Sequence, residues 1–346
     1  MLKVFTELIP GIPHIPLLYP NLGRPENEGR MPFLNDAFGG LKDKIVETAG
    51  SPSEADYILI PHNFPSVRNL GVYLQKMTDF SEDHGKKIIV FWHGDSCEEV
   101  MVPNAVVFRT SQYKSAMRDN ETIIPPYAPD LLERRKLELR HKAQVPVIGF
   151  CGWGRYAGLK NTLATIAKNA IIDFRRIKPK NRSLAVYKKG LTFRMKAFRV
   201  LNKSKFAAAN FILRDSYSGS SHTIRIDPDS GREEYIQNML GSDFPLAVKG
   251  DGNYSYRFYE ALSLGRIPLL IDTDCILPFE DKIDYSSFIV RVDYKDIPRI
   301  DKIVSEFYDG LNEQSFRDMQ IRAREAFEGR LCTEAFLRGA IEQLKM

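Results

Sequence analysis

Cysteine is scarce in this chain of 346 residues. Its four cysteines are scattered, with no CxxC pair and with no histidine at the spacing of a zinc ligand set. This distribution favours small buried side chains in a reducing compartment over a zinc site or a disulfide framework. The four residues are Cys97, Cys151, Cys275 and Cys332.

Long apolar runs are also missing. No run approaches the roughly 18 to 20 residues that a membrane-spanning helix needs. Residues 1–20, MLKVFTELIPGIPHIPLLYP, contain one lysine and several prolines, whereas a signal peptide needs an unbroken apolar helix. We therefore expect a cytoplasmic location.

Acidic residues are missing from one segment, residues 174–206, which holds twelve lysines or arginines and no acid. Because the whole chain carries a net charge of +5, the rest of it sums to −7. A solvated face, a nucleic-acid patch and a patch for anionic membrane all fit this composition. Residues 191–201 are amphipathic at helical spacing, which favours an interfacial helix on anionic lipid at the inner face of a membrane. No readout motif accompanies the charge, so we expect no nucleic-acid partner.

Strands and helices alternate along the first part of the chain. Apolar, β-branched runs predict strands at 2–8, 55–61, 86–94 and 105–111. Helical periodicity predicts helices at 33–50 and 68–85, the second of which ends on a glycine cap. This alternation is typical of a parallel sheet that is covered by helices.

A second alternation begins at residue 145. It follows a segment, 125–144, in which we expect a proline-rich turn and a highly charged helix. A chain of this length exceeds what one hydrophobic core usually organises. We therefore predict two α/β domains and a helical tail, with boundaries at 1–140, 145–310 and 311–346.

The junction at residues 249–274, KGDGNYSYRFYEALSLGRIPLLIDTD, has the features of a ligand site. Gly250 and Gly252 allow the backbone to approach a ligand closely. The helix that starts behind them offers unpaired N–H groups to an anion. Asn253 or Ser255 can cap this helix.

The charges of this junction point to a nucleoside diphosphate. Lys249 and Arg257 add positive charge where the helix dipole is already positive, which costs stability unless an anion such as phosphate neutralises it. Glu260 lies one turn further along on the same side as Arg257, and its carboxylate suits the two hydroxyls of a ribose. The alternative is an Arg257–Glu260 surface pair on a capped helix.

The pattern K-G-x-G-N-x-S-x-R-F-x-E-A-L-x-x-G-R-I-P, followed by LPFEDKIDYSSFIV, closely resembles the exostosin-type glycosyltransferases of family 47, especially their short bacterial members. Residues 249–290 carry the resemblance, and the segments ADYILIPHNF, FWHGDS and NFILRDSYSG extend it weakly. Arg266 stands where animal and plant relatives often have cysteine, a departure that the bacterial type shares.

The resemblance implies a GT-B fold, in which two Rossmann-like domains face a central cleft. It implies that the second domain holds a UDP or GDP sugar and that the first holds a glycan or lipid-linked glycan acceptor. It further implies inverting hexosyl or pentosyl transfer without a cofactor or an obligatory metal, which suits surface polysaccharide biosynthesis. The alternatives are a non-catalytic carbohydrate- or nucleotide-binding protein of this fold, or a nucleic-acid-binding protein that uses residues 174–206.

The catalytic base should follow a strand of the first domain. Asp95 and His93 come directly after the apolar strand IIVFW, so either could deprotonate an acceptor hydroxyl. The alternative for Asp95 is a helix cap.

Two arginines are further candidates for phosphate binding, and two aspartates are candidates for metal binding. Arg155 and Arg214 follow strands and could reach the phosphates, or they could be ordinary solvated arginines. Asp272 and Asp274 spell a DxD motif, but they follow a strand in the wrong half of the chain for a metal-binding glycosyltransferase motif. We therefore expect them to be loop acids and expect no metal site.

Overall fold

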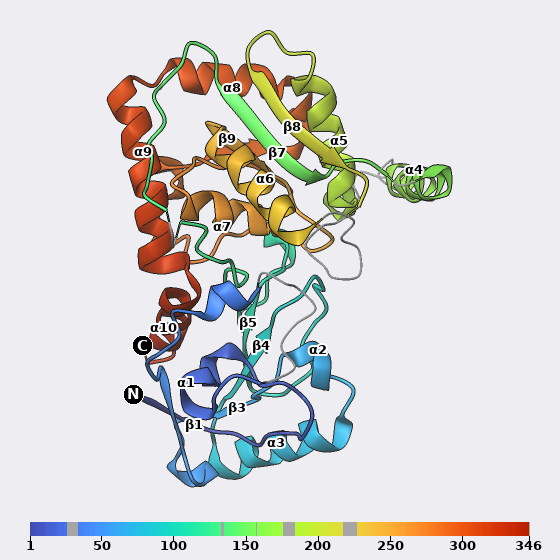
Figure 1. The fold of residues 1–346 in the computed structure, drawn as a ribbon. Coiled ribbons are helices and arrows are strands. Elements are labelled where there is room, and N and C mark those ends of the chain that lie inside the picture. Colours follow the sequence, from blue (N-terminus) through green and yellow to red (C-terminus); the bar gives the residue numbers. More distant parts are fainter. Residues whose placement is uncertain (26–33, 133–134, 157, 176–183, 217–226, 346) are drawn as a thin grey trace.

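The computed structural model has two lobes, each built on its own parallel sheet (Figure 1). It describes residues 1–25, 34–132, 135–156, 158–175, 184–216 and 227–345.

The first sheet has the strand order β2-β1-β3-β4-β5-β6. All of its strands pair in parallel. Every residue of β4 is buried, as the apolar run IIVFW requires of a strand covered on both faces. The strands are β1 (Leu2–Phe5), β2 (Val46–Thr48), β3 (Tyr57–Leu59), β4 (Ile88–Trp92), β5 (Ala105–Arg109) and β6 (Glu121–Ile123).

The second sheet has the order β11-β10-β9-β7-β8, again with parallel pairs throughout. Its strand order reverses between β7 and β9, which is where doubly wound sheets bind their ligands. The strands are β7 (Val147–Trp153), β8 (Ala208–Arg214), β9 (Phe244–Ala247), β10 (Leu269–Asp272) and β11 (Val290–Asp293). Two Rossmann-like domains of this kind form the GT-B fold, so the predicted fold class is confirmed.

Helices cover both sheets. As the sequence indicated, α3 ends at Gly85 in the left-handed conformation, with φ 60°. Among the described residues, no helix combines the length and the apolar character needed to cross a membrane. The helices are α1 (Tyr19–Leu22), α2 (Phe64–Val67), α3 (Gly71–His84), α4 (Gly158–Arg175), α5 (Gly190–Leu201), α6 (Pro228–Leu240), α7 (Tyr256–Ser263), α8 (Ile300–Asp309), α9 (Glu313–Ala326) and α10 (Thr333–Gln343).

Two predicted helices are wrong. Residues 34–38 form a short 3-10 helix that stops before Gly39 and Gly40, and Val46–Thr48 form strand β2 instead. The described part of the segment 125–144 contains no helix, because its charged side chains bind the second domain. Arg140, for example, donates to Asp243 at 2.5 Å. In both places tertiary contacts override local helix propensity.

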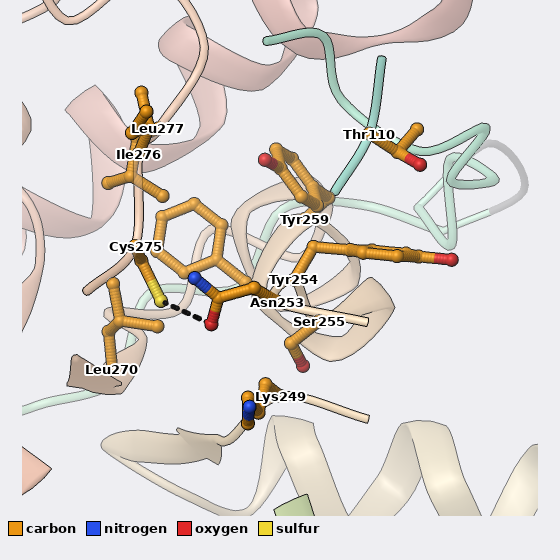
Figure 2. Close-up of a pocket in the computed structure, with 11 residues that line it drawn as sticks. Thr110, Lys249, Asn253, Tyr254, Ser255, Tyr259, Leu270, Cys275, Ile276 and Leu277 are labelled. Atoms are coloured by element: carbon orange, nitrogen blue, oxygen red, sulfur yellow. Dashed lines mark hydrogen bonds between the residues drawn. The ribbon is translucent and has the colours of Figure 1, made fainter. Parts of the chain in front are cut away.

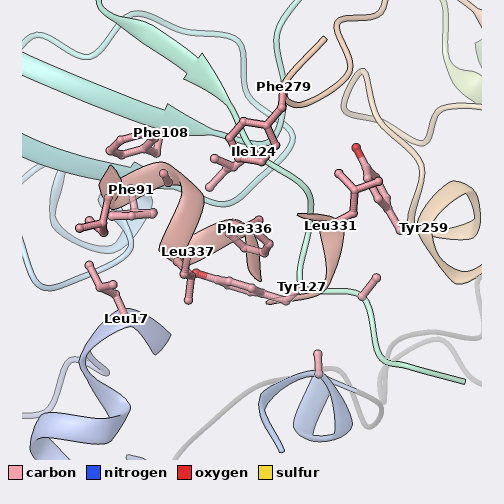
Figure 3. Close-up of a cluster of buried hydrophobic side chains, with 14 of the residues drawn as sticks. Leu17, Phe91, Phe108, Ile124, Tyr127, Tyr259, Phe279, Leu331, Phe336 and Leu337 are labelled. Carbon is pink, nitrogen blue, oxygen red and sulfur yellow. The ribbon is translucent and has the colours of Figure 1, made fainter. Parts of the chain in front are cut away.

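The C-terminal helices do not form a separate unit. Helices α8 and α9 pack on the second domain, whereas α10 crosses back to the first (Figure 1). Phe336 and Leu337 of α10 share one buried cluster with Phe91 and Phe108 of the first sheet (Figure 3). The Tyr57 hydroxyl also donates to the carbonyl of Leu344 just beyond α10, at 3.0 Å.

We expect Phe336→Ala to lower the free energy of unfolding by about 3–5 kcal/mol, because it opens a cavity where a fully buried ring now packs. Met101, whose side chain is 81% exposed, provides the control: Met101→Ala should cost less than about 0.5 kcal/mol. Urea denaturation measures both. Equal losses in the two variants would contradict the docking of α10 on the first sheet.

Candidate functional site

The start of helix α7 lies at the point where the second sheet reverses its order. Ser255 occupies the N-cap position, but its side chain makes no capping hydrogen bond. The Asn253 side chain binds elsewhere, so the expectation that Asn253 or Ser255 caps this helix is wrong. A Cβ atom added at Gly250 would meet none of the described atoms within 4 Å. Both features suit an incoming anion.

Arg257 reaches from α7 to the carboxyl end of β7. Its Nη2 donates to the Cys151 carbonyl at 2.6 Å, and the guanidinium carbon lies 3.9 Å from the Phe150 ring centroid. Its Nε is buried and has no hydrogen-bond partner among the described atoms. Gly152 leaves room for the guanidinium, because a Cβ there would approach Nη2 to 3.1 Å. Arg257 thus brings an unsatisfied donor to the reversal point.

Glu260 lies on the same face of α7 as Arg257, as the spacing predicted. Its Oε2 accepts a hydrogen bond of 2.5 Å from the hydroxyl of Tyr235 on α6. Burial raises the pKa of the Glu260 carboxyl, while the Tyr235 hydrogen bond and the charges of Arg257 and Arg232 act in the opposite direction. The sequence analysis missed Tyr235, since one aromatic residue within a charged helix gives no signal of this role.

Arg155 and Arg214 lie at the carboxyl ends of the neighbouring strands. Arg214 forms an ion pair with Glu234 of α6, which also accepts a hydrogen bond from the Cys151 thiol at 3.9 Å. Arg155 is exposed, and its backbone N–H donates to the Arg214 carbonyl at 3.1 Å. The structure therefore brings Arg214 into the same cluster as Arg257, and the charge of Arg214 is matched by that of Glu234.

Arg194 of α5 is a further cation at this point. Its guanidinium donates to the Trp153 carbonyl at 3.2 Å and to the carbonyls of Val248 and Lys249 at 3.2 and 3.0 Å. These carbonyls end β7 and follow β9, so Arg194 joins the two strands at the reversal point. The sequence analysis missed it because Arg194 lies within the basic segment, where each cation looks like its neighbours.

Helix α5 itself corrects an expectation. The apolar side chains of residues 191–201 are buried in the core of the second domain, among them Phe193, Phe198 and Leu201. Amphipathicity at this helix reflects packing on the protein, so the prediction that residues 191–201 dock on lipid is wrong. Residues 176–183 of the basic segment lie outside the described residues.

The ammonium group of Lys249 donates hydrogen bonds to two groups of the protein itself. Its Nζ donates to the Tyr113 hydroxyl at 2.8 Å and to the Val186 carbonyl at 2.5 Å. Burial lowers the pKa of this ammonium to about 8. Tyr113 belongs to the first domain, so the lysine joins the two domains beside the start of α7.

Asn253 joins the domains as well. Its backbone N–H donates to Ser111 Oγ at 3.0 Å, and its Nδ2 donates to the carbonyls of Gln112 at 3.1 Å and Asp274 at 3.0 Å. The Asp274 carboxylate in turn accepts hydrogen bonds from the backbone N–H and the hydroxyl of Ser115. The loop before α7 is thereby fixed to the loop that follows β5.

The two aspartates of the DxD spelling have protein partners. Asp274 binds Ser115, and Asp272 forms an ion pair with Arg291 at 2.8 Å. Within the described residues, no cluster of three or more histidine, cysteine, aspartate or glutamate side chains could hold a metal ion.

Asp95 faces the start of α7 across the domain boundary. A Cβ atom added at Gly252 would lie 2.7 Å from Asp95 Oδ1, so glycine is required there for the two loops to meet. Asp95 is exposed, and residues 96–102 contain no helix. The alternative that Asp95 caps a helix is therefore wrong.

Arg109 holds the loop that carries Asp95. The fully buried guanidinium donates to the carbonyls of Ser96 at 2.6 Å and Glu98 at 3.0 Å, and it pairs with Glu121. The Arg109 guanidinium thus fixes the backbone on the C-terminal side of Asp95.

His93 has a different environment from Asp95. Its ring stacks on Tyr127 with centroids 3.8 Å apart, and its Nε2 is buried without a hydrogen-bond partner among the described atoms. Burial lowers the pKa of His93 to about 3. The imidazole is therefore neutral at physiological pH and is a weak base.

A pocket opens beside α7 between the two domains (Figure 2). Thr110 of the first domain lines it together with residues of the loop before α7, of α7 itself and of the segment after β10. Its cavity volume is about 20 Å³, which is room for about one water molecule. The lining residues are Thr110, Lys249, Asn253, Tyr254, Ser255, Phe258, Tyr259, Leu270, Cys275, Ile276 and Leu277.

Residues 179–307 match the model of the Exostosin GT47 domain. This range includes α5, α6 and α7, which supply Arg194, Tyr235, Arg257 and Glu260. This match confirms the resemblance to the exostosin-type glycosyltransferases that the sequence pattern carries.

Two curated relatives come from plants. A probable glucuronosyltransferase of Oryza sativa subsp. japonica is 39% identical over 71 residues, which are 20% of this chain and 16% of the relative. A probable beta-1,4-xylosyltransferase of Arabidopsis thaliana is 38% identical over 71 residues, which are 20% of this chain and 17% of the relative. The matched segment thus covers less than a fifth of either relative's length.

Two solved structures are similar over nearly the whole chain. Anabaena Alr3699/HepE in complex with UDP has a TM-score of 0.40 at 12% identity and covers 100% of both chains. A glycosyltransferase from Rickettsia africae ESF-5 has a TM-score of 0.37 at 12% identity and covers 99% of this chain and 98% of its own. Both TM-scores are too low for a conclusion about ligands.

We expect His93→Phe to reduce the loss of stability in acid. The folded-state pKa of about 3 lies below the ordinary value of 6.5, so the unfolded chain binds the proton first as the pH falls. The stability that neutral His93 contributes is complete above pH 6.5 and is lost progressively toward pH 3. Phenylalanine keeps the stacking on Tyr127 and removes the titration. Chemical denaturation at several pH values measures the effect, and parallel curves for both proteins would contradict the buried neutral imidazole.

Proposed function

We propose that this protein is an inverting glycosyltransferase that moves a sugar from a nucleoside diphosphate to a hydroxyl of a glycan or glycolipid acceptor, in the synthesis of a surface polysaccharide. The observation that supports this proposal most is Arg257, which lies at the reversal point of the second sheet beside the start of α7. Its buried Nε has no hydrogen-bond partner among the described residues. Both features belong to the segment that matches the GT47 model.

The diphosphate leaving group takes its stabilisation from fixed positive charge. Arg257 and Arg194 meet at the carboxyl ends of β7 and β9, and the dipole of α7 adds partial positive charge at the same point. Phosphate oxygens accept hydrogen bonds from backbone N–H groups at the helix start and from Arg257 Nε. This arrangement supplies the charge that a bound metal would otherwise supply, so we expect transfer without one.

Glu260 binds the ribose of the donor. The Tyr235 hydroxyl occupies Oε2 and fixes the plane of the carboxylate, while Oε1 accepts no hydrogen bond from the described residues. That oxygen suits a vicinal diol one helical turn from the phosphates. Burial raises the pKa of the Glu260 carboxyl, and the negative charge of a bound diphosphate nearby would raise this pKa further.

Asp95 serves as the general base. Its carboxylate takes the proton of the acceptor hydroxyl while that oxygen attacks the anomeric carbon, and the bond from this carbon to the phosphate oxygen breaks with inversion. The electron pair of the broken bond leaves with the diphosphate, which Arg257 and α7 stabilise. The close approach of Asp95 to Gly252, across the domain boundary, supports this role.

We expect Arg257→Ala to weaken the binding of UDP or GDP at least about tenfold, because it removes charge-assisted hydrogen bonds from the phosphates. Arg257→Lys should restore only part of the affinity, since lysine lacks the forked donor geometry. Isothermal titration calorimetry with both nucleotides measures the effect, and Arg199→Ala on the exposed face of α5 is the matched control. Unchanged affinity in Arg257→Ala would overturn the proposed phosphate site.

We expect Asp95→Asn to lower turnover at least about a hundredfold and to leave donor affinity nearly unchanged. Asp251→Asn, a change of the same kind at an exposed acid of the opposite loop, should retain turnover. Donors that stabilise the protein in a thermal-shift screen of nucleotide sugars provide the substrate for both assays. Retained turnover in Asp95→Asn would remove this residue from the mechanism, and retention of the anomeric configuration in the product would exclude inversion.

A further inference from the structure

Helix α4 presents its apolar side to solvent. Four of its large apolar side chains are more than half exposed: Leu163 at 64%, Ile166 at 57%, Ile171 at 54% and Phe174 at 75%. Together with two exposed alanines at positions 167 and 170, they follow the spacing i, i+3, i+4, i+7, i+8 and i+11. This spacing produces one continuous stripe, which in a globular protein normally faces the core.

The opposite side of α4, which carries Thr165, Asn169 and Ile172, faces the protein. Asn169 donates to the hydroxyl of Thr192 on α5 at 3.1 Å. Thr165 and Ile172, which share the Asn169 side of the helix, are less exposed than the residues of the apolar stripe. Figure 1 shows α4 at the margin of the second domain, away from the layers that cover the sheet. An apolar stripe in this orientation is typical of a helix that meets a second apolar phase.

Exposed basic residues continue the surface from α4 along α5. Thr192, which contacts α4, lies on the same side of α5 as Lys196 and Arg199, because these residues are spaced i, i+4 and i+7. Both basic side chains are exposed, and exposed Lys203 and Lys205 follow the end of the helix. The residues from 174 to 206 include no acid, so no negative side chain of this segment offsets the charge.

We propose that α4 docks on an anionic lipid surface, with its apolar stripe at the boundary between headgroups and acyl chains and with Arg199, Lys203 and Lys205 on the lipid phosphates. Apolar burial and basic attraction act together in such interfacial helices. A second copy of the chain suits this face poorly, because a two-fold interface would bring the exposed Arg199, Lys203 and Lys205 of each copy toward those of the other. Nucleic acid would satisfy the charge but would leave the aliphatic stripe in water.

Vesicle co-sedimentation of the full chain tests the proposal. Vesicles of phosphatidylglycerol and phosphatidylcholine in equal parts should bind the protein, and vesicles of phosphatidylcholine alone should bind it at least about tenfold more weakly. The double variant Ile166→Asp with Phe174→Asp should lower binding to the anionic vesicles at least about tenfold. Both side chains are exposed, so the variant should keep its thermal unfolding temperature.

Matched variants separate the contribution of apolar burial to vesicle binding from the contribution of the basic side chains. Val72→Asp with Met101→Asp changes two exposed apolar residues of the first domain and should leave vesicle binding unchanged. Arg199→Gln with Lys203→Gln and Lys205→Gln should weaken binding to anionic vesicles, whereas the same change at Lys3, Lys42 and Lys44 should weaken it less. Failure of the unchanged protein to bind anionic vesicles would overturn the proposal. So would full binding by the α4 double variant, or the loss in that variant of a dimer detected by light scattering.

Discussion

The loop between β9 and α7 performs two tasks with one stretch of backbone, and the rest of the candidate site depends on it. Lys249 and Asn253 bind the first domain through Tyr113, Ser111 and Gln112. Arg257, four residues after Asn253, lies at the reversal point of the second sheet, and its Nε has no partner in the part of the chain that the structure describes. Because the Asn253 side chain is used between the domains, it does not cap α7. The contact that joins the two domains thereby lies directly beside the candidate anion site.

Much of this arrangement could be predicted from the sequence, because it depends on local patterns. Continuous apolar runs define the central strands, and the spacing of Arg257 and Glu260 places them on one face of α7. The partners of these residues could not be predicted, because they come from distant elements. Tyr235 reaches Glu260 from α6, and Arg194 joins the ends of two strands. The short strands β2 and β6 were missed for the same reason, since each has three residues and gains its stability from a neighbouring strand.

Helices α4 and α5 show why periodicity alone does not identify a membrane-facing helix. Both have an apolar stripe, and the sequence favoured residues 191–201 for lipid because they are amphipathic at helical spacing and lie in the basic segment. In the structure that stripe is buried in the core, whereas the stripe of α4 faces outward. The hydrophobic pattern shows that a helix has an apolar side. Whether protein covers that side depends on the neighbouring elements.

The return of α10 to the first sheet means that the chain crosses between the domains twice, once through the segment 125–144 and once after α9. Two domains joined at two separate points have fewer ways to move relative to each other than two domains joined by one linker. A rotation about the line through both crossings displaces them least, whereas a shear displaces both. We therefore expect any relative movement of the two domains to be a hinge rotation about that line.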